Sequence, residues 1–210
     1  MALGFANAKG SAQKDRADSY AMKDGENRLR LVGDLLARYV YWIKGENNKP
    51  LPFECLAFNR QTESFDNAEK DYVKDFYPDL KCTWAYTVQA IDLTNGQLRI
   101  FNLKKKLLGQ IMDEVEELGD PTDPVTGWDI VFKKEKTGPL PINVEYKLQV
   151  RKCLPRPLTE AEMETIKELK SMDEVLPRPT PQAQKELLEK LAKGSSENVD
   201  EEIDEEISAS

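Results

Sequence analysis

The sequence predicts a mainly β protein, built as a small closed or partly closed barrel of six or seven short strands with one long helix. Two observations support this fold class. Short β-branched and aromatic segments recur between turn residues as far as residue 150, and a single longer segment among them has helical apolar spacing. A barrel buries such strands without leaving long open edges.

The strand candidates either alternate polar with apolar residues or are rich in β-branched and aromatic residues. Residues 45–50 are typical of a turn, and Asn95-Gly96 favours a tight hairpin because both residues accept positive φ. Residues 59–80 are polar with scattered aromatics and have no assigned structure. The predicted strands are residues 28–32, 39–43, 53–58, 82–92, 97–101, 128–134 and 142–150.

The predicted long helix covers residues 103–118, where Leu, Ile, Met and Val recur at spacings of three and four, and Gly119 ends it. Residues 120–127 predict a rigid pair of turns that delivers Trp128 into the next strand. They do not fit a calcium loop, which requires acids at alternate positions, glycine sixth and glutamate twelfth.

Two short helices are expected after Pro155. Thr159 and Glu162 fit a capping box, and Thr180-Pro181 fits an N-cap followed by proline at the first helical position. The predicted organisation is a flexible polar and basic arm (1–27), a β core (28–154), a Pro-rich linker with two short helices (155–194) and a disordered acidic tail (195–210).

The negative charge is confined to the last quarter of the chain. Residues 1–154 hold 23 Lys and Arg against 23 Asp and Glu, whereas residues 155–210 hold 7 against 15, which accounts for the net charge of −8. The body is therefore neutral, and the overall charge does not exclude an anionic ligand.

The residue types present exclude several kinds of chemistry. The chain has no histidine, which excludes Ser-His-Asp and Cys-His nucleophile systems and His-ligated metals. Its three cysteines, Cys55, Cys82 and Cys153, do not suffice for a disulfide framework or a four-cysteine zinc site. We expect no enzymatic activity, no metal and no cofactor.

No stretch of the chain has the roughly 18 to 20 apolar residues that a membrane span needs. Residues 1–7 lack the charged and apolar regions of a secretory signal. A cytoplasmic location without membrane association is the expectation.

The first candidate site is aromatic. Tyr39 and Tyr41 share one strand face, and Trp84 and Tyr86 share a face of another, because side chains alternate along a strand. Exposed rings of this kind stack on unpaired bases, and the alternative is that they form the barrel core. Basic residues interleaved with them favour stacking, because bases bring phosphates; these are Arg30, Lys44, Lys81 and Arg99.

The second candidate is the triplet Lys104-Lys105-Lys106 at the predicted helix start. Cations are unfavourable there because of the helix dipole, and a phosphate backbone would relieve the conflict. The alternative is a solvated helix face. The glycines of a nucleotide-binding P-loop are missing before the triplet.

The acidic tail is the third candidate. A flexible polyanion can occupy a phosphate-binding groove and, once displaced by nucleic acid, bind protein partners. The alternative is a tail that only increases solubility. The acids expected to contact partners are Glu201, Glu202, Asp204, Glu205 and Glu206.

The order of motifs resembles a known family. The matching segments include residues 29–32, 83–92, 99–101 before the lysine triplet, and 157–162. The most specific is Gly119-Asp120-Pro121-Thr122-Asp123-Pro124, followed by Gly127-Trp128-Asp129. Over residues 28–162 and the acidic end, the chain resembles the single-stranded-DNA-binding proteins of tailed bacteriophages, the helix-destabilising proteins typified by the T-even phages.

This resemblance implies an OB-fold core, cooperative sequence-independent binding of single-stranded DNA, and an acidic C-terminal region that recruits proteins of phage replication, recombination and repair in the infected bacterial cell. It implies stacking on Trp84 and Tyr86, and DNA-backbone contacts from Arg30 and the lysine triplet. The arm at 9–16 would stand where the family contacts a neighbouring subunit, giving self-association on DNA. Several members carry a Cys and His zinc insertion, and residues 59–80 contain neither residue type, so we predict no zinc.

Two other functions fit parts of the sequence. One is an acidic protein-interaction module without nucleic-acid binding, whose aromatics are all core and whose C-terminal helices dock on a partner. The other is a metal-dependent nuclease, which would cut single strands in the presence of Mg²⁺.

Overall fold

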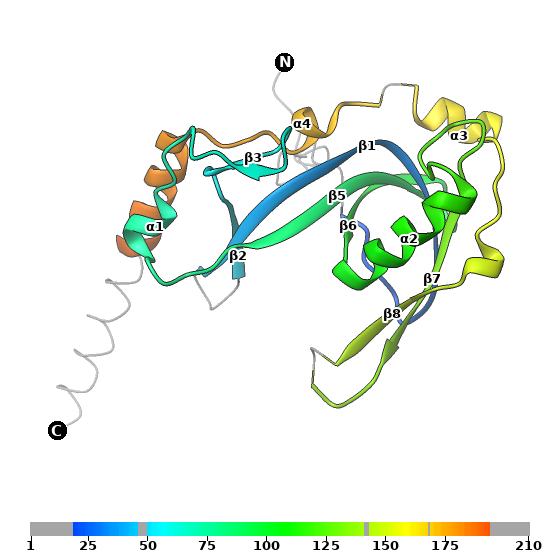
Figure 1. The fold of residues 1–210 in the computed structure, drawn as a ribbon, viewed down its shortest axis with the longest axis horizontal. Coiled ribbons are helices and arrows are strands. Elements are labelled where there is room, and N and C mark those ends of the chain that lie inside the picture. Colours follow the sequence, from blue (N-terminus) through cyan, green and yellow to red (C-terminus); the bar gives the residue numbers. More distant parts are fainter. Residues whose placement is uncertain (1–18, 46–49, 141–142, 168, 194–210) are drawn as a thin grey trace, which may run out of the picture.

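A computed structural model describes residues 19–45, 50–140, 143–167 and 169–193. The fold is mainly β, as the sequence predicts, and its principal element is a six-stranded sheet in the order β6-β5-β1-β7-β8, with β2 paired to the far end of β1 (Figure 1). A separate two-stranded hairpin, β3-β4, lies beside it. The arrangement fits a small OB-like barrel.

The strands and helices have the following bounds. The strands are β1 Gly25–Lys44, β2 Pro50–Glu54, β3 Phe58–Asn59, β4 Ser64–Phe65, β5 Thr83–Asp92, β6 Gln97–Leu103, β7 Asp129–Lys136 and β8 Val144–Leu148. The helices are α1 Val73–Phe76, α2 Lys105–Leu118, the 3-10 turn η3 Val150–Lys152, α3 Glu160–Thr165, α4 Met172–Val175 and a helix over residues 181–193.

The long strand β1 joins the two halves of the molecule. It pairs with β7 over its first residues, with β5 along its middle and with β2 at its end. Gly33 adopts φ +70, and the pairing with β5 shifts register between Val32 and Leu36, so the strand bends there. The prediction of two strands at 28–32 and 39–43 is therefore wrong, because both belong to this one bent strand.

The connectivity is that of a partly open barrel. β1, β5 and β6 pair in succession as a meander. The chain then continues through α2 to β7, which pairs with the first half of β1, and β8 pairs with β7. Among the described residues no ladder joins β6 to β8. On the β6 side Tyr20 donates its amide to Ile100 O at 2.8 Å, and on the β8 side Gln110 of α2 binds the backbone of Tyr146 and Leu148.

The barrel core lies between the inner sheet face and α2. It contains Leu29, Phe101 and Phe132, and Leu107 and Ile111 project into it from α2. Trp128 is fully buried and donates from its indole nitrogen to Gly119 O at 2.9 Å. The turns at 120–127 were predicted to deliver Trp128 into the next strand; Trp128 directly precedes β7, which begins at Asp129, and its side chain enters the core.

A second core lies where β1 extends beyond the barrel. The other end of β1, together with β2 and α1, packs Tyr41, Phe53 and Val73 against Leu188 from the helix at 181–193. This half contains the β3-β4 hairpin and α1, which lie in the region without a prediction (59–80) except for Phe58, the last residue of the strand predicted at 53–58.

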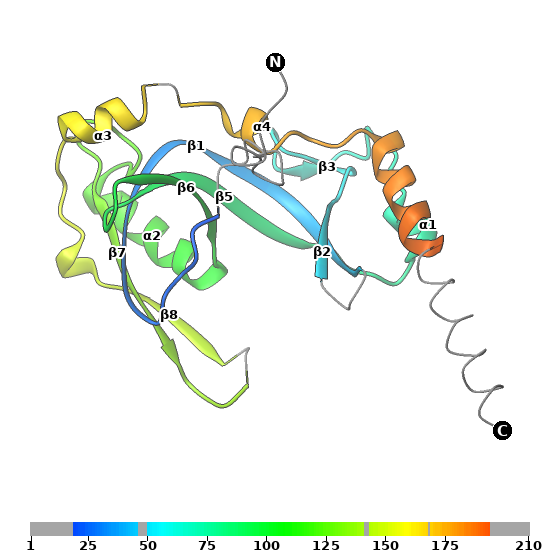
Figure 2. The same ribbon diagram turned by 180° about the vertical axis from the view of Figure 1, so that it is seen from behind.

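The C-terminal segment (residues 155–193) runs along the outer side of β1 from one half to the other (Figures 1 and 2). Leu158, Ile166 and Leu169 pack on Val32 and Ile91 of the sheet. The capping box of Thr159 with Glu162 is confirmed, and α4 was not predicted.

An ionic cluster fastens the segment near its middle. The Arg60 guanidinium lies 2.6 Å from a Glu54 oxygen and 2.6 Å from Asp173, and Arg178 also reaches Glu54, at 3.2 Å. Glu54 belongs to β2, Arg60 to the turn after β3, and Asp173 to α4, so the cluster joins the hairpin to the segment.

The predicted hairpin at Asn95-Gly96 forms, but by a longer turn. Asp92 pairs with Gln97, so four residues connect β5 and β6, and of Asn95 and Gly96 only Gly96 has positive φ. Asp92 O accepts from the amides of both residues. Among the described helices, none is long and apolar enough to cross a membrane.

Docking of the helix at 181–193 depends on Leu188, which is fully buried, whereas its neighbour Leu187 is 46% exposed. We expect Leu188→Ala to lower the free energy of unfolding by about 2–5 kcal/mol through the cavity it leaves. The matched change Leu187→Ala is expected to cost about 0.5 kcal/mol or less. Urea unfolding followed by circular dichroism compares them, and equal losses would show that the helix is not docked through Leu188.

Candidate functional site

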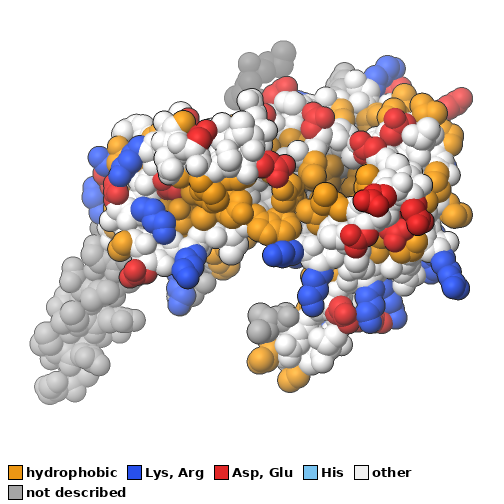
Figure 3. All heavy atoms as spheres, in the orientation of Figure 1, with side chains coloured by type: hydrophobic (Ala, Val, Ile, Leu, Met, Phe, Trp, Pro, Cys, Tyr) orange, Lys and Arg blue, Asp and Glu red, His pale blue; other side chains and the backbone are white. Residues whose placement is uncertain are grey.

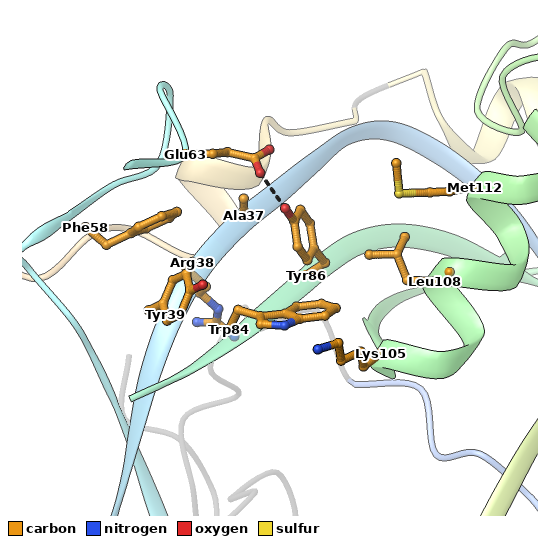
Figure 4. Close-up of a pocket in the computed structure, with 11 residues that line it drawn as sticks. Ala37, Arg38, Tyr39, Phe58, Glu63, Trp84, Tyr86, Lys105, Leu108 and Met112 are labelled. Atoms are coloured by element: carbon orange, nitrogen blue, oxygen red, sulfur yellow. Dashed lines mark hydrogen bonds between the residues drawn. The ribbon is translucent and has the colours of Figure 1, made fainter. Parts of the chain in front are cut away.

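A pocket of about 350 Å³ opens between the β1-β5 ribbon, the β3-β4 hairpin and the start of α2 (Figure 4). In the space-filling view a band of hydrophobic side chains runs through this hollow, with Lys and Arg side chains at its edge (Figure 3). The lining residues are Ala37, Arg38, Tyr39, Phe58, Glu63, Trp84, Tyr86, Lys105, Leu108, Gly109 and Met112.

The aromatic floor follows from strand register. Tyr39 pairs with Trp84 and Ala37 with Tyr86, so these side chains share one sheet face. Farther along β5 the same face enters the barrel core, where Val88 is fully buried. Trp84 and Tyr86 therefore lie where the core opens to the surface, partly exposed, with ring centroids 4.9 Å apart and planes at 80°.

The hairpin forms the second wall. Tyr39, Phe58 and Phe65 make a cluster with centroid separations of 4.8 to 5.3 Å, and Phe65 is 50% exposed. The Tyr86 hydroxyl donates to the carboxylate of Glu63 in the turn between β3 and β4. Burial, followed by this carboxylate, raises the pKa of Tyr86 to about 12.

The start of α2 supplies cations. Lys104, Lys105 and Lys106 are all exposed, and the Lys105 ammonium lies 5.8 Å from the centre of the Trp84 ring. Lys104 is the N-cap without a side-chain hydrogen bond, and the first turn contains no acid. The positive end of the helix and the lysines thus reinforce one another beside the pocket, as the sequence predicts.

Two predicted binding residues are buried elsewhere, and these expectations need correction. Arg30 has no exposed surface; it donates to Asp123 O at 2.7 Å and lies 3.7 Å from Asp129. Tyr41 is 2% exposed and donates to Asp71 at 3.0 Å. Each holds segments of its own core together, and neither lines the pocket beside Trp84; Tyr41 instead borders the second pocket described below.

Three further predicted cations lie outside the pocket lining. Lys44, at the end of β1, and Lys81, just before β5, are exposed at the same end of the ribbon as Trp84. Arg99 pairs with Ala90, six residues along β5 from Trp84, a separation of about 20 Å. Arg99 is thus not part of the same site.

Sequence reasoning missed the residues from the hairpin and from the exposed side of α2. Phe58, Glu63 and Met112 line the pocket, and Phe65 packs beside it. The sequence did contain a signal: Phe58 and Phe65 stand seven residues apart at the start of a polar stretch. Large aromatic side chains grouped on a protein surface often mark a binding site.

A second pocket of about 590 Å³ lies beyond the Phe58-Phe65 pair and includes Cys55, Lys70 and Lys74. Burial raises the pKa of the Cys55 thiol, so it stays protonated at neutral pH. Within the described ranges, no group of three or more Cys, Asp or Glu residues is placed to hold a metal ion. The acids of the predicted tail, 195–210, and the arm at 9–16 lie outside the described residues.

Comparison with known proteins gives one informative match. The chain is 30% identical over 161 residues to a probable ssDNA-binding protein of Escherichia phage T5, covering 71% of this chain. It spans 60% of the length of that relative. No family model matches the chain, and no solved structure matches it.

Burial of Tyr86 and its contact with Glu63 predict a raised pKa for the Tyr86 hydroxyl. Burial raises the pKa of Tyr20 to about 12 as well, so the wild-type protein should show two tyrosines that ionise near 12 and Tyr86→Phe should show one, measured by ultraviolet absorbance of tyrosinate. Because the folded state favours the protonated form, this contribution to stability is present below about pH 10 and is lost as the pH rises toward 12. In Glu63→Gln the pKa should fall only in part, since burial remains; a pKa of 10 in wild type would mean a solvated hydroxyl.

Proposed function

We propose that this chain is a non-enzymatic single-stranded-DNA-binding protein of a tailed phage, of the helix-destabilising type found in the T-even phages. The observation that supports this most directly is the pocket at the open end of the barrel, where Tyr39, Trp84 and Tyr86 lie beside Lys105. The similarity to a probable ssDNA-binding protein of phage T5 supports the same ligand.

The proposed mechanism combines stacking with charge. Bases stack on Trp84 and Tyr86, each contact contributing about 1–3 kcal/mol without regard to sequence. The phosphates then contact the exposed lysines at the start of α2. These contacts release the counterions that surround the DNA, so the binding affinity decreases as the salt concentration rises. β5 and β6 are the second and third strands of the barrel meander, which form the binding face of OB folds.

The remaining parts of the chain have proposed roles around the β core, which was predicted at residues 28–154 and in the structure also includes Tyr20 and the start of β1 at Gly25. The acidic tail at 195–210 competes with DNA for the groove and, when released, recruits replication, recombination and repair proteins. The arm at 9–16 supports self-association along DNA, and the protein acts in the cytoplasm of the infected host cell.

The first test is binding of fluorescein-labelled oligo-dT, measured by anisotropy so that loss of a tryptophan does not affect the signal. Trp84→Ala should weaken binding by about 1–3 kcal/mol with circular dichroism unchanged. Trp42→Ala is the matched control, because Trp42 is 54% exposed but lies outside the pocket lining. The proposal fails if the wild-type protein does not bind oligo-dT in low salt, or if Trp84→Ala and Trp42→Ala lose the same amount of affinity for it.

The second test is the salt dependence of the same binding. Changing Lys104, Lys105 and Lys106 to Ala should reduce the slope of log K against log salt by about 2, since each phosphate contact on a single strand contributes about 0.7. A triple change of equal charge in the C-terminal segment, at Lys167, Lys185 and Lys190, should leave the slope nearly unchanged. Equal slopes in the two triple variants would remove α2 from the DNA path.

A further inference from the structure

The pocket contains a negative charge where a polyanion is proposed to bind. Among the described residues that line it, three are charged, Arg38, Glu63 and Lys105, and Glu63 is the one acid. A carboxylate beside a DNA strand repels phosphates, so it is unfavourable unless it contacts another part of the nucleotide.

The structure holds Glu63 firmly in this place. It ends the four-residue turn between the paired residues Asn59 and Ser64, with φ +48, a conformation that residues with a Cβ rarely adopt. At the start of the same turn Arg60 binds Glu54 at 2.7 and 2.6 Å and Leu176 O at 3.0 Å. The hydroxyl of Tyr86 then binds the carboxylate itself.

Glu63 and Lys105 lie on opposite sides of the Trp84-Tyr86 pair (Figure 4). The two rings are nearly perpendicular, so a single base lies flat on only one of them. For a nucleotide stacked on Tyr86, the ammonium of Lys105 attracts the phosphate. The base edge then points toward the carboxylate of Glu63. The two charges therefore orient the nucleotide across the aromatic floor.

The chemistry of the carboxylate distinguishes between bases. An ionised carboxylate only accepts hydrogen bonds. Cytosine presents an N4 amino group, which Glu accepts from in known base recognition, whereas thymine presents the O4 acceptor at the same position. A thymine edge facing Glu63 would place two acceptors together.

We propose, on the basis of the single-stranded-DNA binding proposed above, that Glu63 recognises the edge of the base stacked on Tyr86, against which Trp84 packs edge to face, and gives this subsite a preference for cytosine over thymine. Tyr86 is then both a stacking ring and a positioning residue, because its hydroxyl orients the carboxylate. The preference acts at one nucleotide of a longer bound strand, so it modulates binding that is otherwise independent of sequence.

The test compares labelled oligo-dC and oligo-dT of equal length by anisotropy at one salt concentration and slightly alkaline pH. Glu63→Gln should lower the dC-to-dT affinity ratio about fivefold or more. Glu116→Gln is the matched control, because it removes the same charge from the exposed side of α2 outside the pocket. Loss of charge alone strengthens binding to both oligonucleotides and cancels in the ratio.

Tyr86→Phe separates positioning from stacking. It keeps the ring, so affinity for oligo-dT should change less than about threefold, while the dC-to-dT ratio falls because the carboxylate loses its donor. A Tyr86 that only stacks would leave the ratio as in wild type, which would overturn its positioning role.

The outcomes distinguish the two proposals. Wild-type protein that binds neither oligonucleotide overturns the proposed function and this inference together. Wild-type protein that binds both, with a ratio that Glu63→Gln leaves unchanged, overturns the inference alone. Circular dichroism of each variant confirms the fold, which the exposed Glu63 and Glu116 side chains are not expected to affect.

Discussion

The bend of β1 at Gly33 is the constraint on which the rest of the structure depends. A φ of +70 favours glycine, and a Cβ there would lie 2.9 Å from the Leu169 side chain, so both the strand and the C-terminal segment rely on this position. Before the bend β1 completes the barrel, and after it β1 supports the second core. Trp84 and Tyr86 pair with β1 beyond the bend; Tyr86 packs against both cores, Trp84 packs against the barrel core, and both remain partly exposed.

Local patterns predicted most of the elements, because period-two alternation, helical spacing and capping residues depend only on neighbouring residues. They could not predict that residues 28–32 and 39–43 form one strand, since a strand that continues through a glycine bulge looks like two strands in sequence. The β3-β4 hairpin was missed for a related reason. It has two residues per strand and is held by Arg60 contacts with partners as distant as Asp173, which no local pattern contains.

The same distinction applies to the site. The alternation of side chains along a strand correctly predicted that Trp84 and Tyr86 share a face. The lysine triplet around Lys105 correctly indicated a helix start whose positive end no acidic residue neutralises. Alternation does not specify depth, so Arg30 and Tyr41, on the same strand as Tyr39, were expected at the surface although they are buried. Their burial is set by β7 and by Asp71, segments far away in the chain.

Tyr20 covers part of the outer edge of β6, and this has a practical consequence. There a backbone bond from Tyr20 to Ile100, and the edge-to-face contact of Tyr20 with Phe101, cover part of a strand edge that no neighbouring strand of the described chain pairs with. Unpaired strand edges are templates for association between molecules. A truncated form that begins after Asp24 would lack Tyr20 and would leave this edge open to pairing with another molecule.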